Sequence, residues 1–436
     1  MNRRTVLRSA GLACAVGLAG CSEGPDSGSG TSRSTTARTS EPGPEPESRT
    51  ATDSKATPED DSTTEPGDTD TDADTDTDAD PNPDPEPRSG TTLSGLAIDA
   101  TPAALATLGP YERWATQRPA TVTTFVNGLE SPDGVEQFVE KRLTPIWERG
   151  GVPIVTWMPA YTNPPENSDP AVDRRIRAGE YDRIIEKWAT SIEEWVLGPE
   201  GERTPQRRIY LRPAHEMNGN WFPWSATDSE STPADYIGMW RRVHDIFTGT
   251  AMESTHLQWI WAPNADEVGD IEAEQYYPGD EYVDWLGLDG FNFGDVESWS
   301  DWRSPEELFG GMLGRIRAIT DKPVALTEFA STSFIDGTYR PEMKARWIRD
   351  VFSMIEREGI AMACWFDIDK RGEDESDWAV FGGDRGTAMY TDLQTVERYP
   401  VYEGYKEVVR SPWVLPARSE YPRVLTDREF AGRLDG

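Results

Sequence analysis

The stretch IYLRPAHEMNGNWFPW, Ile209–Trp224, begins as an apolar β-strand and breaks into a polar, aromatic loop. At the break lie Arg212, His215, Glu216, Asn218 and Trp221. A carboxylate at a strand end can supply proton chemistry, and flat indole faces suit sugar rings. The stretch therefore indicates a sugar-cleaving site at the end of a strand. The alternative is a buried Arg–Glu ion pair beside ordinary core aromatics.

Strand-like apolar runs alternate with amphipathic helical stretches from about Thr92 onward. The expected strands are Ser94–Ala100, Thr121–Asn127, Val152–Pro159, Arg208–Ala214, Leu257–Pro263, Val283–Phe291, Pro323–Phe329 and Ile360–Ile368. The expected helices include Val135–Arg149, Tyr181–Val196, Pro233–Thr248, Pro305–Ile319 and Glu342–Glu358, and a last helix at Thr395–Val409. Several strands are continuously apolar, as strands buried on both faces are. About eight strand–helix units predict an α/β fold of the (β/α)8 barrel type.

A doubly wound open sheet is the alternative fold. It is disfavoured because no glycine-rich phosphate loop follows the first expected strand. The barrel domain is expected at residues 91–412, followed by a C-terminal tail at 413–436 to which the sequence assigns no role. Residues 22–90 hold Ser, Thr, Pro, Gly, Asp and Glu with almost no apolar side chains, so this segment is expected to be a disordered acidic linker.

The charge balance is strongly acidic, because 43 Lys and Arg residues stand against 78 Asp and Glu residues, for a net charge of -35. Nucleic acid and anionic lipid both need positive potential, so both are disfavoured as partners. Only 7 of the basic residues are Lys. Acidic side chains are spread over the folded part of the chain as well as the linker. This distribution predicts adaptation to high salt, because salt screens the repulsion between the acidic side chains. An ordinary acidic secreted protein is the alternative.

Residues 1–21 are expected to be a targeting segment and no part of the fold. Asn2–Leu7, NRRTVL, resembles a twin-arginine export signal, and Leu18–Cys21, LAGC, resembles a lipobox in which cleavage leaves Cys21 to carry lipid. These features predict an exported protein anchored to the outer face of the cell membrane. A plain cleaved signal with an incidental Cys21 is the alternative. The apolar run is too short to span a bilayer.

Metals, cofactors and disulfides are not expected. Cys14, Cys21 and Cys364 are distributed in a way that permits no disulfide framework. Neither His244 nor His256 forms an i,i+4 pair with a second ligand, so a catalytic metal is disfavoured. No redox or nucleotide cofactor motif is present. The expected partner is a polysaccharide substrate, with membrane contact only through the lipid on Cys21, and the protein is expected to be a monomer.

The reacting groups of a (β/α)8 barrel lie at the C-terminal ends of its strands. The expected strand ends carry Trp157, His215, Glu216, Trp261, Asn264, Asp289, Phe291, Asn292, Glu328, Trp365 and Asp367. Several tryptophans clustered at one barrel mouth favour a carbohydrate groove. We therefore expect the groove to contain Trp157, Trp261 and Trp365, with Asp289 and Asn292.

Glu216 and Glu328 form the decisive pair. They end the fourth and seventh expected strands, which face each other across the barrel mouth. Retaining glycosidases use two carboxyls about 5 Å apart, one as acid/base and one as nucleophile. Glu216 is predicted to be the acid/base, and Glu328 the nucleophile with Arg212 as its hydrogen-bonding neighbour. The alternatives are an inverting pair about 6.5–9.5 Å apart, or two unrelated ion pairs.

The motif RPAHEMNGNWFPW, with LTEF and CWFDID further on, resembles glycoside hydrolase family 26 over roughly Thr92–Val409. The best-known members are retaining endo-β-1,4-mannanases on a (β/α)8 barrel. The resemblance implies that Glu216 is the proton donor and Glu328 the nucleophile. It also implies that His215 positions the glycone-side sugar. Arg212 and Asn218 belong to the same motif and are expected in the substrate site.

The same resemblance implies an aromatic platform at Trp221 and a tryptophan under the sugar at the cleavage point, Trp365. Phe291 departs from the family pattern, in which a tyrosine hydroxyl commonly hydrogen-bonds the nucleophile. This puts substrate specificity in doubt more than mechanism. The leading function is endo-β-1,4-mannanase. β-1,3-Xylan or mixed-linkage β-glucan are alternative substrates, and a non-catalytic surface carbohydrate-binding lipoprotein is the alternative from another class.

Overall fold

The structure, a computed structural model, describes residues 90–99, 101–162, 164–198, 207–227, 229–371, 376–418 and 425–434. The predicted leader with Cys21, and the predicted linker up to residue 89, lie outside the described residues and stay predictions. All described residues fall in the same structural unit. None of the helices in these ranges has the length and apolar character needed to cross a membrane.

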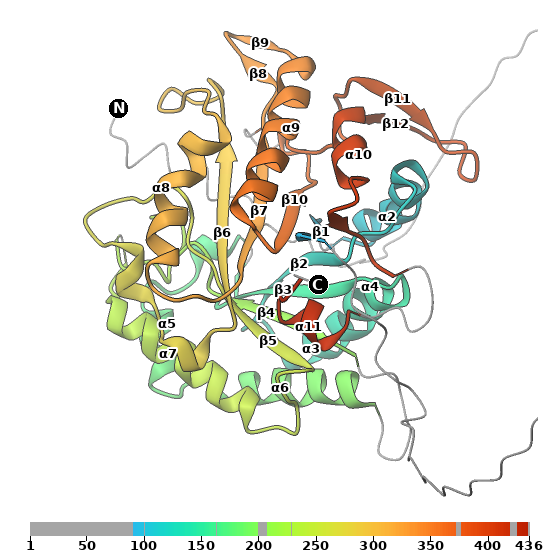
Figure 1. Ribbon diagram of the computed structural model, residues 1–436. Coiled ribbons are helices and arrows are strands. Elements are labelled where there is room, and N and C mark those ends of the chain that lie inside the picture. The colour runs from blue at the N-terminus through green and yellow to red at the C-terminus, as the bar shows by residue number, and fades with distance from the viewer. Residues whose placement is uncertain are drawn as a thin grey trace, which may run out of the picture. The chain divides into compact units, whose positions relative to one another are not determined.

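Eight parallel strands form a closed barrel (Figure 1). They are β1 (Thr92–Ala97), β2 (Thr121–Asn127), β3 (Val152–Met158), β4 (Ile209–Pro213), β5 (Leu257–Trp261), β6 (Trp285–Asn292), β7 (Val324–Ser331) and β10 (Met362–Phe366). Consecutive barrel strands pair with each other, and β10 closes the barrel by pairing with β1. Two short ribbons lie outside this sheet, β8 (Phe334–Ile335) with β9 (Thr338–Tyr339), and β11 (Ala388–Thr391) with β12 (Arg398–Val401). The predicted (β/α)8 barrel is confirmed.

Helices surround the strands (Figure 1). They are α2 (Pro102–Ala115), α3 (Pro132–Phe138), α4 (Thr144–Glu148), α5 (Val172–Arg177), α6 (Asp182–Leu197), α7 (Pro233–Thr248), α8 (Pro305–Arg317), α9 (Pro341–Glu358) and α10 (Glu403–Val409), and a π-helical turn at Val139–Leu143 joins α3 to α4. Local chemistry sets the starts of α7 and α8. Thr232 and Ser304 each accept the amide of the third helical residue, whose carboxylate bonds back to the cap. Proline follows each cap, where its missing N–H costs nothing.

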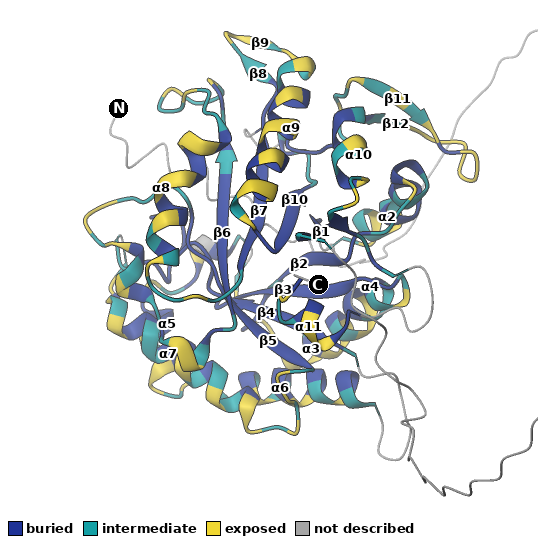
Figure 2. Cartoon of the chain, in the orientation of Figure 1, coloured by how far each residue is buried: buried dark blue, intermediate teal, exposed yellow. Residues whose placement is uncertain are grey.

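The barrel strands are mostly buried, whereas the helices expose their outer sides (Figure 2). Inside the barrel, Tyr210, Ile260, Trp285 and Cys364 belong to one cluster of buried side chains. Successive residues of a strand point to opposite faces. The residues next to each of these four on its own strand therefore point toward the surrounding helices. This alternation decides which strand residues can reach the barrel mouth.

A register shift between β6 and β7 changes which residues of β7 face inward. Leu288 pairs with Leu326, but the next residue, Asp289, pairs with Glu328, so Thr327 is an extra residue on β7. Such a β-bulge re-aims side chains and is common beside active sites. Thr327 and Glu328 consequently both find partners in the barrel interior.

The described residues of the C-terminal tail, which lie beyond the predicted domain end at residue 412, pack against the barrel. β13 (Val414–Leu415) pairs in parallel with β1. The short helix α11 (Asp427–Phe430) lies against the start of β4, where the Tyr210 hydroxyl donates to Phe430 O at 2.9 Å. The centroids of these two rings are 4.5 Å apart. The tail therefore covers the end of the barrel at which the strands begin.

The predicted helix at Thr395–Val409 is wrong over its first half. Arg398–Val401 is the strand β12, and only Glu403–Val409 is helical. Pro400 lacks the amide that a helix interior uses and clashes with the preceding turn. A two-stranded ribbon tolerates it, because both of its strands are edges.

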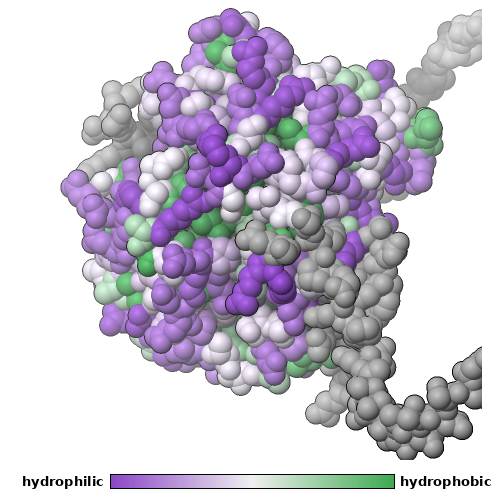
Figure 3. All heavy atoms as spheres, in the orientation of Figure 1, coloured by the Kyte–Doolittle hydropathy of each residue, from purple (hydrophilic) through white to green (hydrophobic). Residues whose placement is uncertain are grey.

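The molecular face in Figure 3 is mostly hydrophilic, with small, scattered apolar patches. Arginines on the outside of the barrel pair with carboxylates, for example Arg315 with Glu267 at 3.1 Å and Arg303 with Asp266 at 2.6 Å. Exposed pairs of this kind each contribute little to stability. The salt adaptation expected from the net charge stays a prediction.

Candidate active site

The chain leaves β4 in a rare backbone conformation. Ala214 and Glu216 have φ angles of 46° and 55°, in the left-handed region that residues other than glycine seldom adopt. The neighbouring strands hold this turn, because Ala214 N donates to Trp157 O at 3.0 Å and Glu216 N donates to Ala262 O at 2.7 Å. Backbone strain of this kind is typical of functional sites.

Neutral donors hold the Glu216 side chain. Trp221 Nε1 donates to Glu216 Oε2 and Asn264 Nδ2 donates to Glu216 Oε1, both at 2.7 Å. Asn218 secures Asn264, since Asn218 Nδ2 donates to Asn264 O and Asn264 N donates to Asn218 Oδ1, each at 2.8 Å. Asn218 is fully buried. The structure gives Asn218 a positioning role and Trp221 a positioning bond, and their predicted contacts with substrate stay predictions.

Arg212 lies beneath the mouth and joins two carboxylates. Its buried guanidinium donates through Nη1 to Asp289 Oδ2 at 2.6 Å and through Nη2 to Glu328 Oε1. Thr156 Oγ1 accepts from Arg212 Nε at 3.1 Å and from Nη2 at 2.6 Å, and Thr327 Oγ1 donates to Asp289 Oδ1 at 2.6 Å. The expected contact between Arg212 and Glu328 is present. Asp289, expected in the groove, is fully buried and bonds Arg212 instead.

The two glutamates differ in their surroundings. Glu328 bonds a cation, whereas Glu216 bonds only neutral side chains among the described residues. Burial raises the pKa of Glu216 to about 7, and the nearby Glu328 charge adds to the rise. Burial also raises the pKa of Glu328, but Arg212 opposes this. Near neutral pH the arrangement favours a proton on Glu216 and a charge on Glu328, which is how environments separate acid/base from nucleophile.

His215 faces an aromatic wall. Its ring centroid lies 4.9 Å from that of Phe222, which stacks on Trp224 at 4.3 Å, and Trp224 Nε1 donates to His215 O at 2.7 Å. Burial, with the Arg212 charge adding to it, holds the pKa of His215 well below its usual range. The imidazole is therefore neutral. Its Nδ1 is buried and has no hydrogen-bond partner in the described part of the chain.

Trp157 and Trp261, which the sequence predicts in the groove, point out of the barrel and are fully buried. Trp157 packs against Gly128, where a Cβ would come within 2.1 Å of the indole. Trp261 lies 5.2 Å from the ring of Tyr277. The residues just before both tryptophans face the barrel interior, so alternation turns the indoles toward the helices. Neither side chain reaches the groove, which corrects both predictions.

Trp365 also lies outside the mouth, contrary to the role that the resemblance implies. Its Nε1 donates to Trp378 O at 2.9 Å, and its ring packs against Phe329 and Trp347 at 5.2 and 6.1 Å. The next residue, Phe366, faces the opposite way. A sugar at the cleavage point therefore cannot rest on the Trp365 indole.

Asn292 ties together the ends of β6 and β7. Its Nδ2 donates to Ser331 Oγ at 3.0 Å, and its Oδ1 accepts from Arg303 N at 2.9 Å. Asn292 is fully buried and has a role in the fold, and its predicted contact with substrate stays a prediction. Across the described residues, no group of three or more His, Cys, Asp or Glu side chains is arranged to hold a metal ion.

Phenylalanine rings line the mouth where tryptophans are expected. The ring centroid of Phe366 lies 6.4 Å from that of Phe125 and 5.3 Å from that of Phe291. The ring centroids of Phe291 and Trp378 are 5.4 Å apart. Alternation would have found Phe366, because it lies two residues after the interior Cys364. Trp378 follows β10 in a segment without strand or helix periodicity, so the sequence holds no signal for its position.

Comparison with known proteins adds the family. Residues 118–357 match the sequence profile of glycosyl hydrolase family 26. Endoglucanase H of Acetivibrio thermocellus is 31% identical over 253 residues, which are 57% of this chain and 25% of that protein. Mannan endo-1,4-beta-mannosidase A and B of Caldalkalibacillus mannanilyticus is 26% identical over 259 residues, which are 56% of this chain and 45% of that protein. The match thus spans less than half the length of these relatives.

A solved structure supports the fold. The catalytic domain of a family 26 endo-β-1,4-mannanase from Bacillus sp. JAMB-750 superposes with a TM-score of 0.54 at 16% identity. The superposition covers 77% of this chain and 90% of that chain. The profile match contains both Glu216 and Glu328 and extends over more than half of the residues. The chain therefore belongs to glycosyl hydrolase family 26.

Proposed function

We propose that this protein is a retaining glycoside hydrolase that cleaves internal β-1,4 linkages of mannan. The observation that carries the proposal is the unequal environment of the two glutamates. Arg212 bonds Glu328, whereas Trp221 and Asn264 bond Glu216. A double displacement needs one carboxylate that stays charged and one carboxyl that exchanges a proton.

In the proposed reaction Glu328 attacks the anomeric carbon, the glycosidic bond breaks, and Glu216 gives its proton to the leaving oxygen. The products of this step are a glycosyl ester of Glu328 and a free sugar chain. Glu216, now ionised, takes a proton from water, and the water oxygen displaces Glu328. Arg212 stabilises the Glu328 charge before attack and after release. Trp221 and Asn264 keep the Glu216 carboxyl in place through both steps.

β-1,4-Mannan is the first substrate to test, because one relative is named a mannan endo-1,4-beta-mannosidase. The other relative is named an endoglucanase, which makes mixed-linkage β-glucan the second candidate, and β-1,3-xylan is the third. A surface protein that binds carbohydrate without turnover is the candidate from another class. The presence of both carboxyls speaks against it, because binding requires no acid and nucleophile.

Product analysis of the full chain tests the proposal. The protein is incubated in high salt with mannan, glucomannan, β-1,3-xylan, mixed-linkage β-glucan and cellulose, and Glu328→Ala serves as the control. Short mannose oligomers are expected from the wild type and not from the control. Cleavage of a different polymer would keep the mechanism and replace the substrate. Binding without cleavage of any polymer would assign the protein to the carbohydrate-binding class.

Glu216→Gln is expected to separate substrates by their leaving groups. Polymer hydrolysis should fall by about 10²–10⁴-fold, the usual contribution of a general acid. Aryl glycosides with good leaving groups need little protonation and should keep the rate of the first step. In the wild type, kcat/KM for polymer should decline as the pH rises above about 7, because Glu216 then loses its proton. Aryl glycosides should show no such decline, and equal losses on both substrates would contradict the assignment.

We also propose that the chain is exported and held at the outer face of the membrane by lipid on Cys21. The sequences NRRTVL and LAGC in the leader support this. The protein extracted from membranes should begin at Cys21 and carry lipid mass on it. An intact mass without lipid would contradict the anchor and leave the enzymatic proposal untouched.

A further inference from the structure

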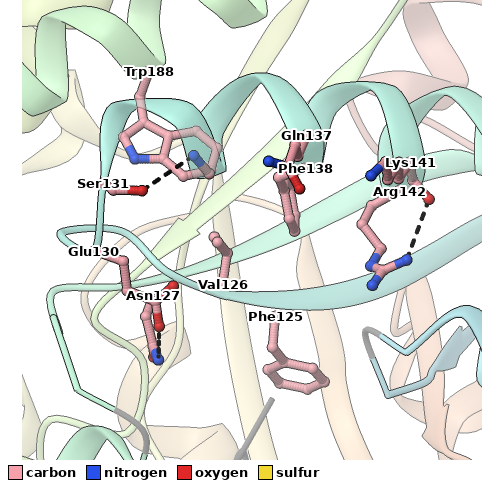
Figure 4. A pocket seen from close by; sticks show the side chains of 11 residues that line it. Phe125, Val126, Asn127, Glu130, Ser131, Gln137, Phe138, Lys141, Arg142 and Trp188 are labelled. Atoms are coloured by element: carbon pink, nitrogen blue, oxygen red, sulfur yellow. Dashed lines mark hydrogen bonds between the residues drawn. The ribbon is translucent and has the colours of Figure 1, made fainter. Parts of the chain in front are cut away.

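A small cavity lies beside the mouth at the C-terminal end of β2. Its volume is about 90 Å³. Phe125 and Asn127 of β2 line one side, and α3 with the π turn Val139–Leu143 lines the other (Figure 4). Phe125 belongs to both places, because its ring also lies 6.5 Å from His215 and 6.4 Å from Phe366. In Figure 4 the Phe125 ring lies on the other side of β2 from Phe138 and Arg142, so β2 separates the cavity from the proposed catalytic groove.

Arg142 brings a positive charge into this cavity. Only 8% of the residue is exposed. Within the described residues it makes one long hydrogen bond, from Nη1 to Lys141 O at 3.4 Å, and no ion pair. Asp99 acts on it electrostatically, and burial lowers the pKa of Arg142. A largely buried arginine that makes no ion pair within the described residues is costly to keep, so its retention here favours a ligand of opposite charge.

The π turn shapes the helix that carries Arg142. Thr144 N bonds to Val139 O, five residues back, so this turn holds one residue more than an α-helical turn. Such insertions are rare and are frequent at functional sites. Lys141 remains exposed, whereas Arg142 and Phe138 extend from the helix toward β2 (Figure 4).

The remaining walls suit a sugar acid. Phe138 and Trp188 supply apolar faces 5.5 Å apart, and the indole N–H of Trp188 is already bonded to a backbone carbonyl. Asn127 Nδ2 donates to Glu130 Oε1 and Thr162 O, both at 3.0 Å, but its buried Oδ1 has no partner in the described ranges. A cation and apolar faces complement the carboxylate and the C–H face of a uronic acid.

We propose that this cavity binds the carboxylate of a uronic-acid side group on the polysaccharide, with Arg142 as its counter-charge. A cavity of about 90 Å³ takes the carboxylate and the carbon that bears it. The sugar ring then stays at the opening of the cavity. In a chain with a net charge of -35, acidic polymers are repelled in general, so a buried cation beside the groove gives such a side group a specific place. That the carboxylate belongs to a side group of a polysaccharide rests on the proposed function, whereas the binding of a carboxylate in the cavity does not.

Calorimetric titration of the full chain with glucuronate, at constant ionic strength, tests the proposal, with glucose as the neutral counterpart. Glucuronate should bind at least about tenfold more tightly than glucose, as hydrogen bonds from a charged donor predict. Arg142→Gln should abolish this difference, and Arg142→Lys should keep part of it. Lys141→Gln is the matched control, because it removes an exposed charge from the same turn. It should change glucuronate binding by less than about twofold.

Equal affinity for glucuronate and glucose would overturn the proposal. Equal losses in Lys141→Gln and Arg142→Gln would also overturn it, because they would indicate general electrostatic attraction. Acetate that binds as tightly as glucuronate would reduce the cavity to a simple anion site and contradict the sugar part. Thermal unfolding verifies that each variant is folded.

Cleavage of neutral mannan is measured in parallel on the wild-type protein. Cleavage without glucuronate binding refutes the side-group site alone. Glucuronate binding without cleavage of any polymer refutes the proposed function alone.

Discussion

Glu328→Ala is expected to lower the turnover of every cleavable polysaccharide by about 10⁴-fold or more, the scale seen when a nucleophile is removed. In the proposed mechanism no glycosyl-enzyme can form without this carboxylate, and Arg212 keeps Asp289 and Thr156 as its partners. Azide is expected to restore turnover of aryl glycosides, because a small anion can occupy the vacated space beside Arg212 and attack the same carbon. Initial rates with and without azide, and the anomeric configuration of the glycosyl azide, are the measurements.

Glu429→Ala is the matched control for this prediction. Glu429 is also buried and paired with an arginine, Arg418, at 3.0 Å, but it belongs to α11 at the opposite end of the barrel. Its removal should lower stability and leave kcat within about twofold of the wild type. Turnover by Glu328→Ala within tenfold of the wild type, or an equal fall in both variants, would mean that Glu328 is not the nucleophile.

Arg212→Met is expected to lower the free energy of unfolding by about 3–5 kcal/mol near neutral pH, the cost of leaving buried charges without their partner. Asp289 and Glu328 both depend on this guanidinium. Burial already raises the pKa values of both carboxyls in the wild type while Arg212 opposes the rise, so in the variant these values should lie still further above those of the unfolded state. A raised carboxyl pKa stabilises the folded state below the unfolded value, and this contribution is lost as the pH rises through the folded value. The destabilisation should therefore shrink as the pH falls.

Denaturant unfolding at about pH 7.5 and about pH 5 measures this dependence. Thr156→Val is the control, because it removes a neutral partner of the same guanidinium. Its cost should be about 1 kcal/mol and equal at both pH values. Arg212→Lys, which keeps the charge but not the planar fork, should fall between the two. A loss in Arg212→Met that does not change with pH would show that the ion pairs are not its cause.

The barrel could be predicted from the sequence because its strands and helices leave strong patterns. The predicted strand Thr121–Asn127 and the predicted helix Pro233–Thr248 have the same bounds in the structure. Continuous apolar runs and capped, proline-started helices are local signals that tertiary packing reinforces here. Glu216 and Glu328 could be selected because a carboxyl at a strand end is chemically conspicuous in a barrel. Their assigned roles in the reaction stay predictions.

The direction of the side chains could not be predicted as well. The position of a residue at the end of a strand determines how far along the barrel axis it lies. The alternation of side chains along the strand determines whether it faces the mouth or the helices. Trp157, Trp261 and Trp365 satisfy the first condition and fail the second. The tail was missed for another reason. α11 spans only Asp427–Phe430, which is too short to show a helical period, and its contact with Tyr210 is distant in sequence.

Glu328 faces the mouth because Thr327 is a surplus residue in the ladder between β6 and β7. Without that surplus, the same glutamate at the same strand end would be directed among the surrounding helices. Whether this barrel brings the proposed nucleophile to its mouth therefore depends on the number of residues in β7 as well as on their identity. A sequence alignment that matches the glutamate but closes a one-residue gap in β7 would pair a chain whose glutamate faces the mouth with one whose glutamate faces the helices. To build the same site into another barrel, a designer would have to copy the β-bulge at Thr327 together with the glutamate.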